Sequence, residues 1–330
     1  MNADARPAGA PGRASLRERA GATLRHGDRL YAVALALASL LVLAIVVAIG
    51  WDLWDGSRLS RDAFGLGFLV SSSWDPAIDR VFGALPFIQG TLVTSFVALL
   101  IAVPLSLGAA VFLAELAPGW LRQPLSLLIE LLAAVPSVVY GLWGLFVLIP
   151  TMVKPLAQGL NGSLGFLPIF AGPVFGPSRL AASVVLATML LPTITAISRD
   201  VLLAIPAAQR EGALALGATR WEVVRQVLIP YGASGFLGAI ILALGRALGE
   251  TIAVTMVIGN NLDLTPSLLH PGYTMASIIA NEFTEATFDL YLNALIEIGL
   301  ALFVITLLIN AFARLLIFRV AGGSARVVQA

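Results

Sequence analysis

The stretch Glu211–Pro230 reads EGALALGATRWEVVRQVLIP and lies between two long apolar segments. Its first half predicts a short helix, because Pro206 is suited to a helix start and Gly217 to a helix end, where glycine tolerates a left-handed backbone. A helix this short, on a loop, has no core of its own in which to bury apolar side chains. The apolar side chains that it displays are Ala213, Leu214 and Leu216.

The second half of the stretch predicts a second short helix. Thr219 is placed to cap this helix, and Glu222, three residues later, completes a capping box. Pro230 is expected to end the helix. Apolar residues displayed on a capped loop predict a docking surface for a partner. An ordinary solvated loop is the alternative, but a linker needs neither paired caps nor displayed alanine and leucine.

The composition places this loop in a membrane protein. Of the 330 residues, 58% are apolar and 12% are charged, whereas soluble domains carry roughly 25% charged residues. The absence of cysteine excludes disulfides and thiolate metal sites, and the two histidines, His26 and His270, lie far apart in sequence. No GxxxxGKS or GxxxxGKT phosphate-binding loop occurs, so ATP-driven work requires another subunit, and no cofactor is expected in this chain. The net charge of +1 argues neither for nor against nucleic acid, but the absence of a basic cluster in the core of the chain argues against it as a partner.

Hydropathy predicts an all-α polytopic membrane protein with six transmembrane helices. The first apolar run is interpreted as an uncleaved span rather than a signal peptide, because Gly50-Trp51-Asp52 is a poor cleavage site. Residues 151–179 are apolar but too rich in glycine and proline for a helix, which predicts an external, partly re-entrant loop. The spans are expected at Leu30–Gly50, Phe87–Leu113, Pro124–Pro150, Leu180–Ile197, Phe236–Gly259 and Tyr291–Ala313.

Basic residues predict the orientation of these spans. Fourteen lysine and arginine residues fall in the segments on one side and five in the segments on the other. The positive-inside rule therefore places both termini and the loop 199–234 in the cytoplasm. The spans are the parts of the chain expected to contact membrane lipid. The resulting segments are a basic cytoplasmic tail, disordered or loosely amphipathic, over 1–29; a first helix over 30–50; a periplasmic loop over 51–86; a transmembrane core over 87–318; and a cytoplasmic tail over 319–330.

The fifth span carries the residues best suited to a translocation path. Arg246 and Glu250 stand four positions apart, which would put them on one helix face near the middle of the span. Ionisable side chains at that depth are costly, and they normally face a bundle interior or an aqueous path. We therefore predict that Arg246, Glu250 and the adjacent Thr251 line a substrate path, with the arginine meeting an anion. A structural ion pair that fixes helix packing is the alternative.

Three other features receive structural interpretations. Glu130 and Glu297 are lone acids in the third and sixth spans, for which helix–helix hydrogen bonds or an interfacial position are expected. Residues 232–235 match the GxSG box of intramembrane serine proteases, but neither histidine lies within a span to deprotonate Ser234. A small-residue turn is favoured there, and a membrane-embedded protease is a distant third function.

The loop Glu211–Pro230 resembles the EAA loop of ABC importer permeases, whose pattern is E-A-A-x3-G-x9-I-x-L-P. The resemblance implies a type I ABC importer (MetI-like) permease fold, in which this loop couples the permease to an ATPase. The positions that match are Glu211, Ala213, Gly217 and Pro230, with Leu214 beside them on the displayed face. The positions that differ are Gly212, Val227 and Ile229.

Further segments resemble one branch of this superfamily, the phosphate-specific permeases of the PstC family. They are Phe82–Ser95, Ile129–Leu148 and Gly245–Asn260, within a likeness that runs from about Leu30 to Phe318. The resemblance implies a permease subunit that moves phosphate across a bacterial inner membrane by alternating access. It also implies a sister permease (PstA), two copies of an ATPase (PstB) and a periplasmic phosphate-binding protein (PstS). A permease of the same fold for another solute is the second function considered.

Overall fold

The computed structural model describes residues 16–327, and residues 1–15 and 328–330 lie outside the described part of the chain. The chain divides into two compact units, Met1–Asp52 and Leu53–Ala330. The first unit holds most of one helix, α1 (Leu16–Gly56), so residues 16–29 are helical rather than disordered. Within α1, Tyr31–Gly56 is apolar enough to cross a membrane, with a mean hydropathy of 3.0 over its most apolar 18 residues.

The described residues contain six helices long and apolar enough to cross a membrane, which confirms the predicted number. One is the apolar part of α1, and the other five belong to the second unit. Their bounds are Leu85–Leu116, Ser137–Leu164, Arg179–Leu203, Arg220–Gly249 and Asp289–Leu315. Three of these contain nearly all of the predicted second, fourth and sixth spans, whereas the third and fifth spans differ from prediction.

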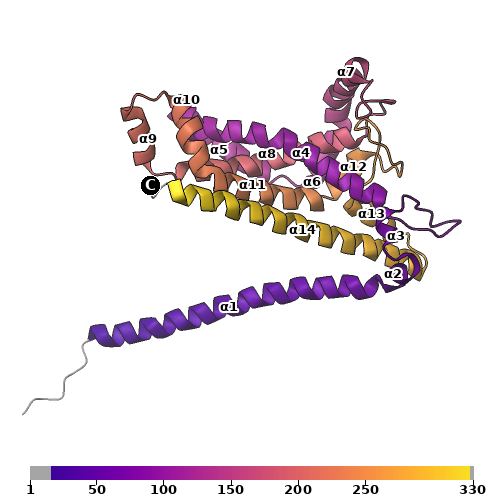
Figure 1. The fold of residues 1–330 in the computed structure, drawn as a ribbon, viewed down its shortest axis with the longest axis horizontal. Coiled ribbons are helices and arrows are strands. Elements are labelled where there is room, and N and C mark those ends of the chain that lie inside the picture. The colour runs from indigo at the N-terminus through magenta and orange to yellow at the C-terminus, as the bar shows by residue number, and fades with distance from the viewer. Residues whose placement is uncertain (1–15, 328–330) are drawn as a thin grey trace, which may run out of the picture. The chain divides into compact units, whose positions relative to one another are not determined.

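Four long helices of the second unit lie alongside one another, as Figure 1 shows: α4 (Leu85–Val111), α8 (Arg179–Leu203), α11 (Ile229–Gly249) and α14 (Asp289–Val327). Buried alanines form the seam between the first three. They are Ala98 and Ala102 on α4, Ala187 on α8, and Ala239, Ala243 and Ala247 on α11. Small side chains allow helix backbones to approach closely, which is the packing that membrane helices favour because lipid supplies no hydrophobic drive.

The third span does not run from Pro124 to Pro150 as predicted. Helix α5 (Gly119–Ala133) ends before Pro136, and a new helix, α6 (Ser137–Trp143), begins after it. Proline disfavours helical geometry in the residue before it, which explains the break. The helix then continues without interruption through the π-helical η2 (Gly144–Val153) and α7 (Lys154–Leu164). Residues 151–164 are therefore helical, and only the later part of 151–179 is the loop that was expected.

Pro230 does not end the second short helix of the opening stretch, which is another correction. The chain is helical from α10 (Arg220–Glu222) through the π-helical η3 (Val223–Leu228) into α11. Proline lacks the N–H for an ordinary helical bond and crowds the preceding turn. Here the preceding turn is widened, because the N–H of Ile229 donates to the Val224 carbonyl five residues back. The widened turn admits Pro230 without a break.

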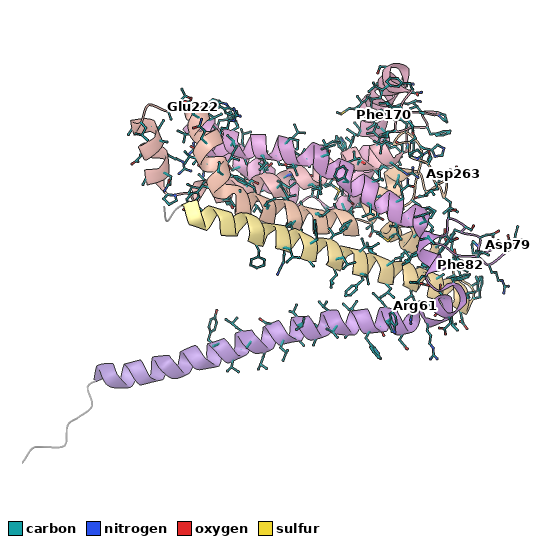
Figure 2. All side chains as sticks on the ribbon, in the orientation of Figure 1. Arg61, Asp79, Phe82, Phe170, Glu222 and Asp263 are labelled. Carbon is teal, nitrogen blue, oxygen red and sulfur yellow. The ribbon has the colours of Figure 1, made fainter. Side chains whose placement is uncertain are left out.

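The end of the second unit opposite α9 and α10 carries short helices and an aromatic cluster. The helices there are α2 (Arg58–Phe64), α3 (Gly67–Val70), α12 (Ile252–Ile258) and α13 (Met275–Glu282). Trp74 is buried in the cluster, and its ring meets Phe82 and Phe87 edge-on at 4.9 and 5.1 Å between centroids. Its indole N–H donates to the Glu282 carboxylate at 2.8 Å. Phe82 is labelled in Figure 2, at this end of the bundle.

A fully buried arginine holds the nearby loops against the start of α8. The guanidinium of Arg179 donates to the carbonyls of Asp263 at 2.9 Å and Ser267 at 3.3 Å, and also to that of Thr265. The backbone adds a bond from the Leu180 N–H to the Leu268 carbonyl at 2.8 Å. The buried charge is thus compensated by carbonyl dipoles. Asp263, labelled in Figure 2, lies on the loop that this arginine fixes.

Candidate functional site

The first predicted short helix is α9 (Ala207–Ala215), at one end of the bundle in Figure 1. Pro206 occupies the N-cap position, and Gly217 has a left-handed backbone with φ of 89°, as the sequence predicted. The N–H of Gly217 donates to the Leu214 carbonyl and the N–H of Ala218 to the Ala213 carbonyl. These two bonds form a Schellman motif, which satisfies carbonyls at the helix end.

The predicted capping box is also present, at the start of α10. The Glu222 N–H donates to Thr219 Oγ1 at 3.3 Å. In return, the backbone N–H and the hydroxyl of Thr219 donate to Glu222 Oε2 at 2.7 and 2.8 Å. Glu222 is labelled in Figure 2, on the same end of the bundle as α9. The caps on both helices fix the turn between them.

The turn between α9 and α10 presents a largely apolar surface. The side chains of Leu214, Leu216 and Trp221 are 48, 91 and 64% exposed. The exposed Glu211 and Gly217 lie beside them in sequence. The docking patch is our name for these five residues: Glu211, Leu214, Leu216, Gly217 and Trp221. Trp221 was missed at the sequence level, although a tryptophan in a charged loop is itself a signal of a contact surface.

Two residues assigned to coupling do not belong to the docking patch. Ala213 is half-buried and packs inward against a cluster that includes Leu202 and Val224, so it is not displayed as predicted. Pro230 is exposed, but it stands in the continuous helix beyond the turn. The contribution of Ala213 is to seat α9 on the bundle, because its small side chain permits a close approach.

The predicted path residues surround a break in the fifth span. Helix α11 ends at Gly249, and the backbone of Glu250 is extended, with φ and ψ of −68° and 124°. The prediction that Arg246 and Glu250 share one face of a continuous helix to Gly259 is therefore wrong. Within residues 16–327, no ion pair joins these two side chains. Arg246 is exposed and Glu250 and Thr251 are half-buried.

Glu250 instead serves the short helix that follows the break. Its Oε1 accepts the N–H of Ala253 at 3.3 Å, which satisfies a free donor in the first turn of α12. The hydroxyl of Thr251 donates to the Gly249 carbonyl at 3.2 Å. The break thus lies within a run of six residues, Arg246 to Thr251, that carries a guanidinium, a carboxylate and a hydroxyl. Such interruptions are where membrane transporters expose backbone and polar side chains to a cavity.

The two lone acids have different surroundings. Glu130 on α5 pairs with Arg199 on α8, with 3.6 Å between Oε1 and a guanidinium nitrogen, in keeping with a helix–helix contact. Glu297 on α14 is buried, and its Oε2 has no hydrogen-bond partner among the residues that the structure describes. The expected hydrogen bond is therefore not made by that atom. Among the described residues no hydrogen bond joins Ser234 to His270, whose ring lies beside the Pro271 carbonyl and packs edge-on against Phe175 at 5.8 Å.

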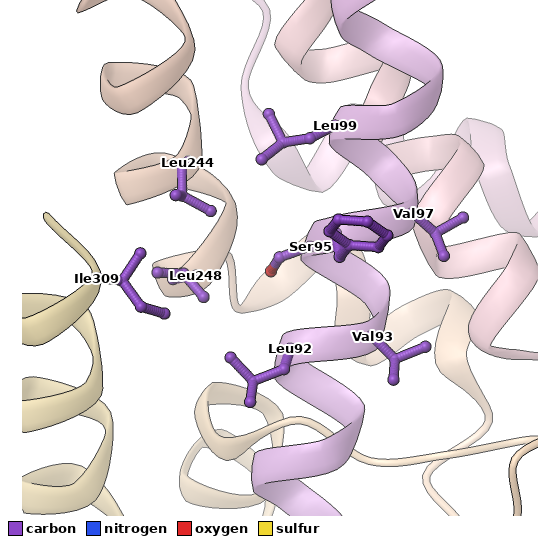
Figure 3. A pocket seen from close by; sticks show the side chains of 9 residues that line it. Leu92, Val93, Ser95, Val97, Leu99, Leu244, Leu248 and Ile309 are labelled. Carbon is purple, nitrogen blue, oxygen red and sulfur yellow. The ribbon is translucent and has the colours of Figure 1, made fainter. Parts of the chain in front are cut away.

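A cavity of about 470 Å³ lies between α4, α11 and α14 and is shown in Figure 3. Leucines and other apolar side chains line it, including Leu92, Leu244 and Ile309. Ser95 supplies the hydroxyl seen in Figure 3, and this hydroxyl has no hydrogen-bond partner among the described residues. The lining carries no charged side chain, so within this chain the cavity offers no counter-charge to an ion.

Comparison with known proteins identifies the family of the chain. Residues 102–322 match the model of the binding-protein-dependent transport system inner membrane component. The phosphate transport system permease protein PstC of Mesorhizobium japonicum is 47% identical over 297 residues, covering 89% of this chain and 90% of that protein. The PstC of Haemophilus influenzae is 47% identical over 294 residues, covering 88% and 93%. A probable PstC of Methanocaldococcus jannaschii is 36% identical over 292 residues, covering 87% and 92%.

Solved structures resemble the fold at lower sequence identity. A chain of a bacterial alginate ABC transporter in complex with its periplasmic protein has a TM-score of 0.54 at 16% identity, covering 88% of this chain and 94% of that one. A chain of the inward-facing MetNI methionine ABC transporter has a TM-score of 0.52 at 20% identity, covering 70% and 93%. These likenesses confirm the predicted type I ABC importer fold. The chain belongs to the family of binding-protein-dependent transport system inner membrane components.

Proposed function

We propose that this chain is the permease subunit of an ATP-driven importer whose cargo is inorganic phosphate. One observation supports the cargo above all: relatives named as phosphate transport permeases are 36–47% identical over about nine-tenths of the chain, in bacteria and in an archaeon. The family match over residues 102–322 includes the broken fifth span as well as the docking patch. The path and the coupling surface are then parts of one machine.

The proposed phosphate path passes the break after α11. Arg246 offers a planar guanidinium, which matches phosphate oxygens in pairs of charge-assisted hydrogen bonds. Glu250, four residues after Arg246, is half-buried, and its negative charge repels the anion. This repulsion limits how tightly the site holds its cargo. Weak binding suits a transporter, because the cargo must leave as well as enter. Thr251 adds a hydroxyl that donates to or accepts from phosphate.

The proposed partners are an ATPase dimer, a sister permease and a periplasmic phosphate-binding protein. Because the sequence has no phosphate-binding loop, ATP is hydrolysed on a separate ATPase dimer of the PstB type. That dimer contacts the docking patch in the cytoplasm of a bacterial cell, where both termini also lie. A sister permease (PstA) completes the path, and a periplasmic phosphate-binding protein (PstS) delivers the cargo. ATP binding closes the ATPase dimer, moves α9 and opens the paired permeases outward.

The test is phosphate uptake by the complete complex, reconstituted with its sister permease, ATPase and binding protein. We expect ATP-dependent uptake of radiolabelled phosphate, and a loss of roughly tenfold or more in Arg246→Gln, because the charge-assisted contact is lost. Arg314→Gln is the matched control, since Arg314 is exposed on α14 and has no assigned role. Near-normal uptake in Arg246→Gln would make the arginine structural.

Cargo competition separates phosphate from the second candidate, another solute. Excess unlabelled phosphate is expected to abolish uptake, whereas sulfate, a dianion of similar size, is not. A complex whose ATPase activity responds to another solute and ignores phosphate would overturn the proposed cargo while leaving the family intact.

A further inference from the structure

Arg210 connects α9, the helix that we propose couples the permease to the ATPase, to the rest of the bundle. Its Nε and one terminal nitrogen both lie 2.9 Å from Oε1 of Glu115, forming a two-point ion pair. The other terminal nitrogen donates to the Ile205 carbonyl at 2.8 Å, and the first also donates to the Leu202 carbonyl at 2.5 Å. About four-fifths of each charged side chain is shielded from solvent, with 21 and 19% exposed.

The two carbonyls belong to the end of α8. Leu202 lies in its last turn and Ile205 just beyond it. Carbonyls at a helix end lack partners within the helix and carry the negative end of its dipole, so a guanidinium there is favoured. Arg210, which lies on α9, therefore caps the carbonyl end of α8.

Glu115 belongs to the end of the neighbouring span. It lies in the π-helical η1 (Phe112–Leu116), which continues α4 directly. Helices α4 and α8 pack along the alanine seam, with Ala98 and Ala187 fully buried or nearly so. One side chain thus connects the coupling helix to both members of this pair of spans.

Apart from this ion pair, α9 is held mainly by its packing against η3. None of its residues is fully buried, and Ala213 provides its inward packing. A hollow of about 210 Å³ lies beside the ion pair, lined by Glu115, Arg210, Leu214 and Arg220 among others. Without the pair, α9 has room to tilt into this hollow. A force on α9 would then reach α4 and α8 less directly, whereas Trp221 remains continuous with α11 through η3.

We propose that Arg210 is the positioning residue that transmits movement of α9 to α4 and α8, through Glu115 and the carbonyls at the end of α8. This inference rests on the proposed function, in which a partner moves α9. Arginine is suited to the role because its rigid planar fork bonds several acceptors at once, whereas lysine presents a point charge.

The test compares Arg210→Met, Arg210→Lys and Glu115→Gln with Arg225→Met in the complete complex. Arg225 is exposed on η3 and makes no ion pair among the described residues, so it serves as the matched control. The measured quantity is phosphate transported per ATP hydrolysed in the assembled complex. We expect a fall of roughly tenfold in Arg210→Met, in the range of coupling between sites, a smaller fall in Arg210→Lys and Glu115→Gln, and none in Arg225→Met.

A second readout does not depend on the cargo. The chain has no cysteine of its own, so spin labels at Gln209→Cys on α9 and Leu203→Cys on α8 report one distance distribution within it. We expect this distribution to broaden in Arg210→Met. If wild-type complex moves no phosphate, the proposed function fails, but the label distances still test Arg210. If Arg210→Met does not assemble, the same two measurements on Arg210→Lys and Glu115→Gln decide. Unchanged label distances and unchanged transport per ATP in the variants that assemble would overturn the proposal.

Discussion

Two glycines in the coupling turn have opposite structural roles. Gly212 lies inside α9 with ordinary helical geometry, and a methyl group added to it would meet no atom within 4 Å. Gly217 also has free space, but its φ of 89° lies in the left-handed region. At Gly217 the backbone alone requires glycine, whereas at Gly212 glycine only loosens the helix.

Replacing each glycine by alanine is expected to move the stability of α9 in opposite directions. Gly212→Ala stabilises the helix by about 0.5–1 kcal/mol, because alanine loses less backbone entropy. Gly217→Ala destabilises its end by about 1–2 kcal/mol, because an L-residue is strained there. Hydrogen exchange of α9 amides in the assembled complex measures both. Equal protection in the two variants would contradict this account of the turn.

At the scale of elements, α4 seats the start of α13. The Met275 N–H donates to Thr91 Oγ1 at 2.9 Å, and the Thr91 hydroxyl donates to the Phe87 carbonyl at 2.8 Å. A Cβ added to Gly90 would lie 1.9 Å from the Tyr273 carbonyl oxygen. The backbones therefore approach at a distance that only glycine allows, and the hydroxyl beside it fixes their register.

Gly90→Ala is expected to separate α4 from this segment and to cost several kcal/mol, because the clash is with backbone rather than with a flexible side chain. The control is Gly108→Ala in the same helix, where the added methyl meets nothing within 4 Å. Thermal unfolding of the purified complex compares the two. If Gly90→Ala unfolded at the temperature of Gly108→Ala, the close approach would not exist in the membrane.

For the whole molecule, α9 and α7 stand at opposite ends of the second unit (Figure 1). With the basic residues gathered on the α9 side, the positive-inside rule predicts that α7 faces outward. Single cysteines can be introduced at exposed positions, Ser163 on α7 and Gln209 on α9, into a chain that has none of its own.

A maleimide that cannot cross membranes is expected to label Ser163→Cys in intact cells and to leave Gln209→Cys unlabelled. After the cells are permeabilised, both should react, which controls for intrinsic reactivity. Labelling of Gln209→Cys alone in intact cells would reverse the proposed orientation and remove the docking patch from the cytoplasm.

Features of the chain that are encoded within one or two turns could be predicted from the sequence. The six spans follow from the length and polarity of apolar runs, and the Thr219–Glu222 box and the left-handed Gly217 follow from residues beside them. The spacing of Glu211 and Gly217 also led to the family. These features depend on neighbours in sequence, so no knowledge of packing is needed.

Other features were decided only by the tertiary structure. Arg210 meets Glu115 across 95 residues of sequence, and no local pattern announces that pairing. Pro230 reads as a stop, but a widened π turn carries the helix through it, whereas Arg246 and Glu250 read as one helical face and are separated by a break. The first depends on how α9 packs against the end of α4, and the other two depend on which backbone hydrogen bonds form at Pro230 and at Glu250. Sequence determined how many segments are apolar enough to cross the membrane, whereas packing decided where those helices begin, bend, break and connect.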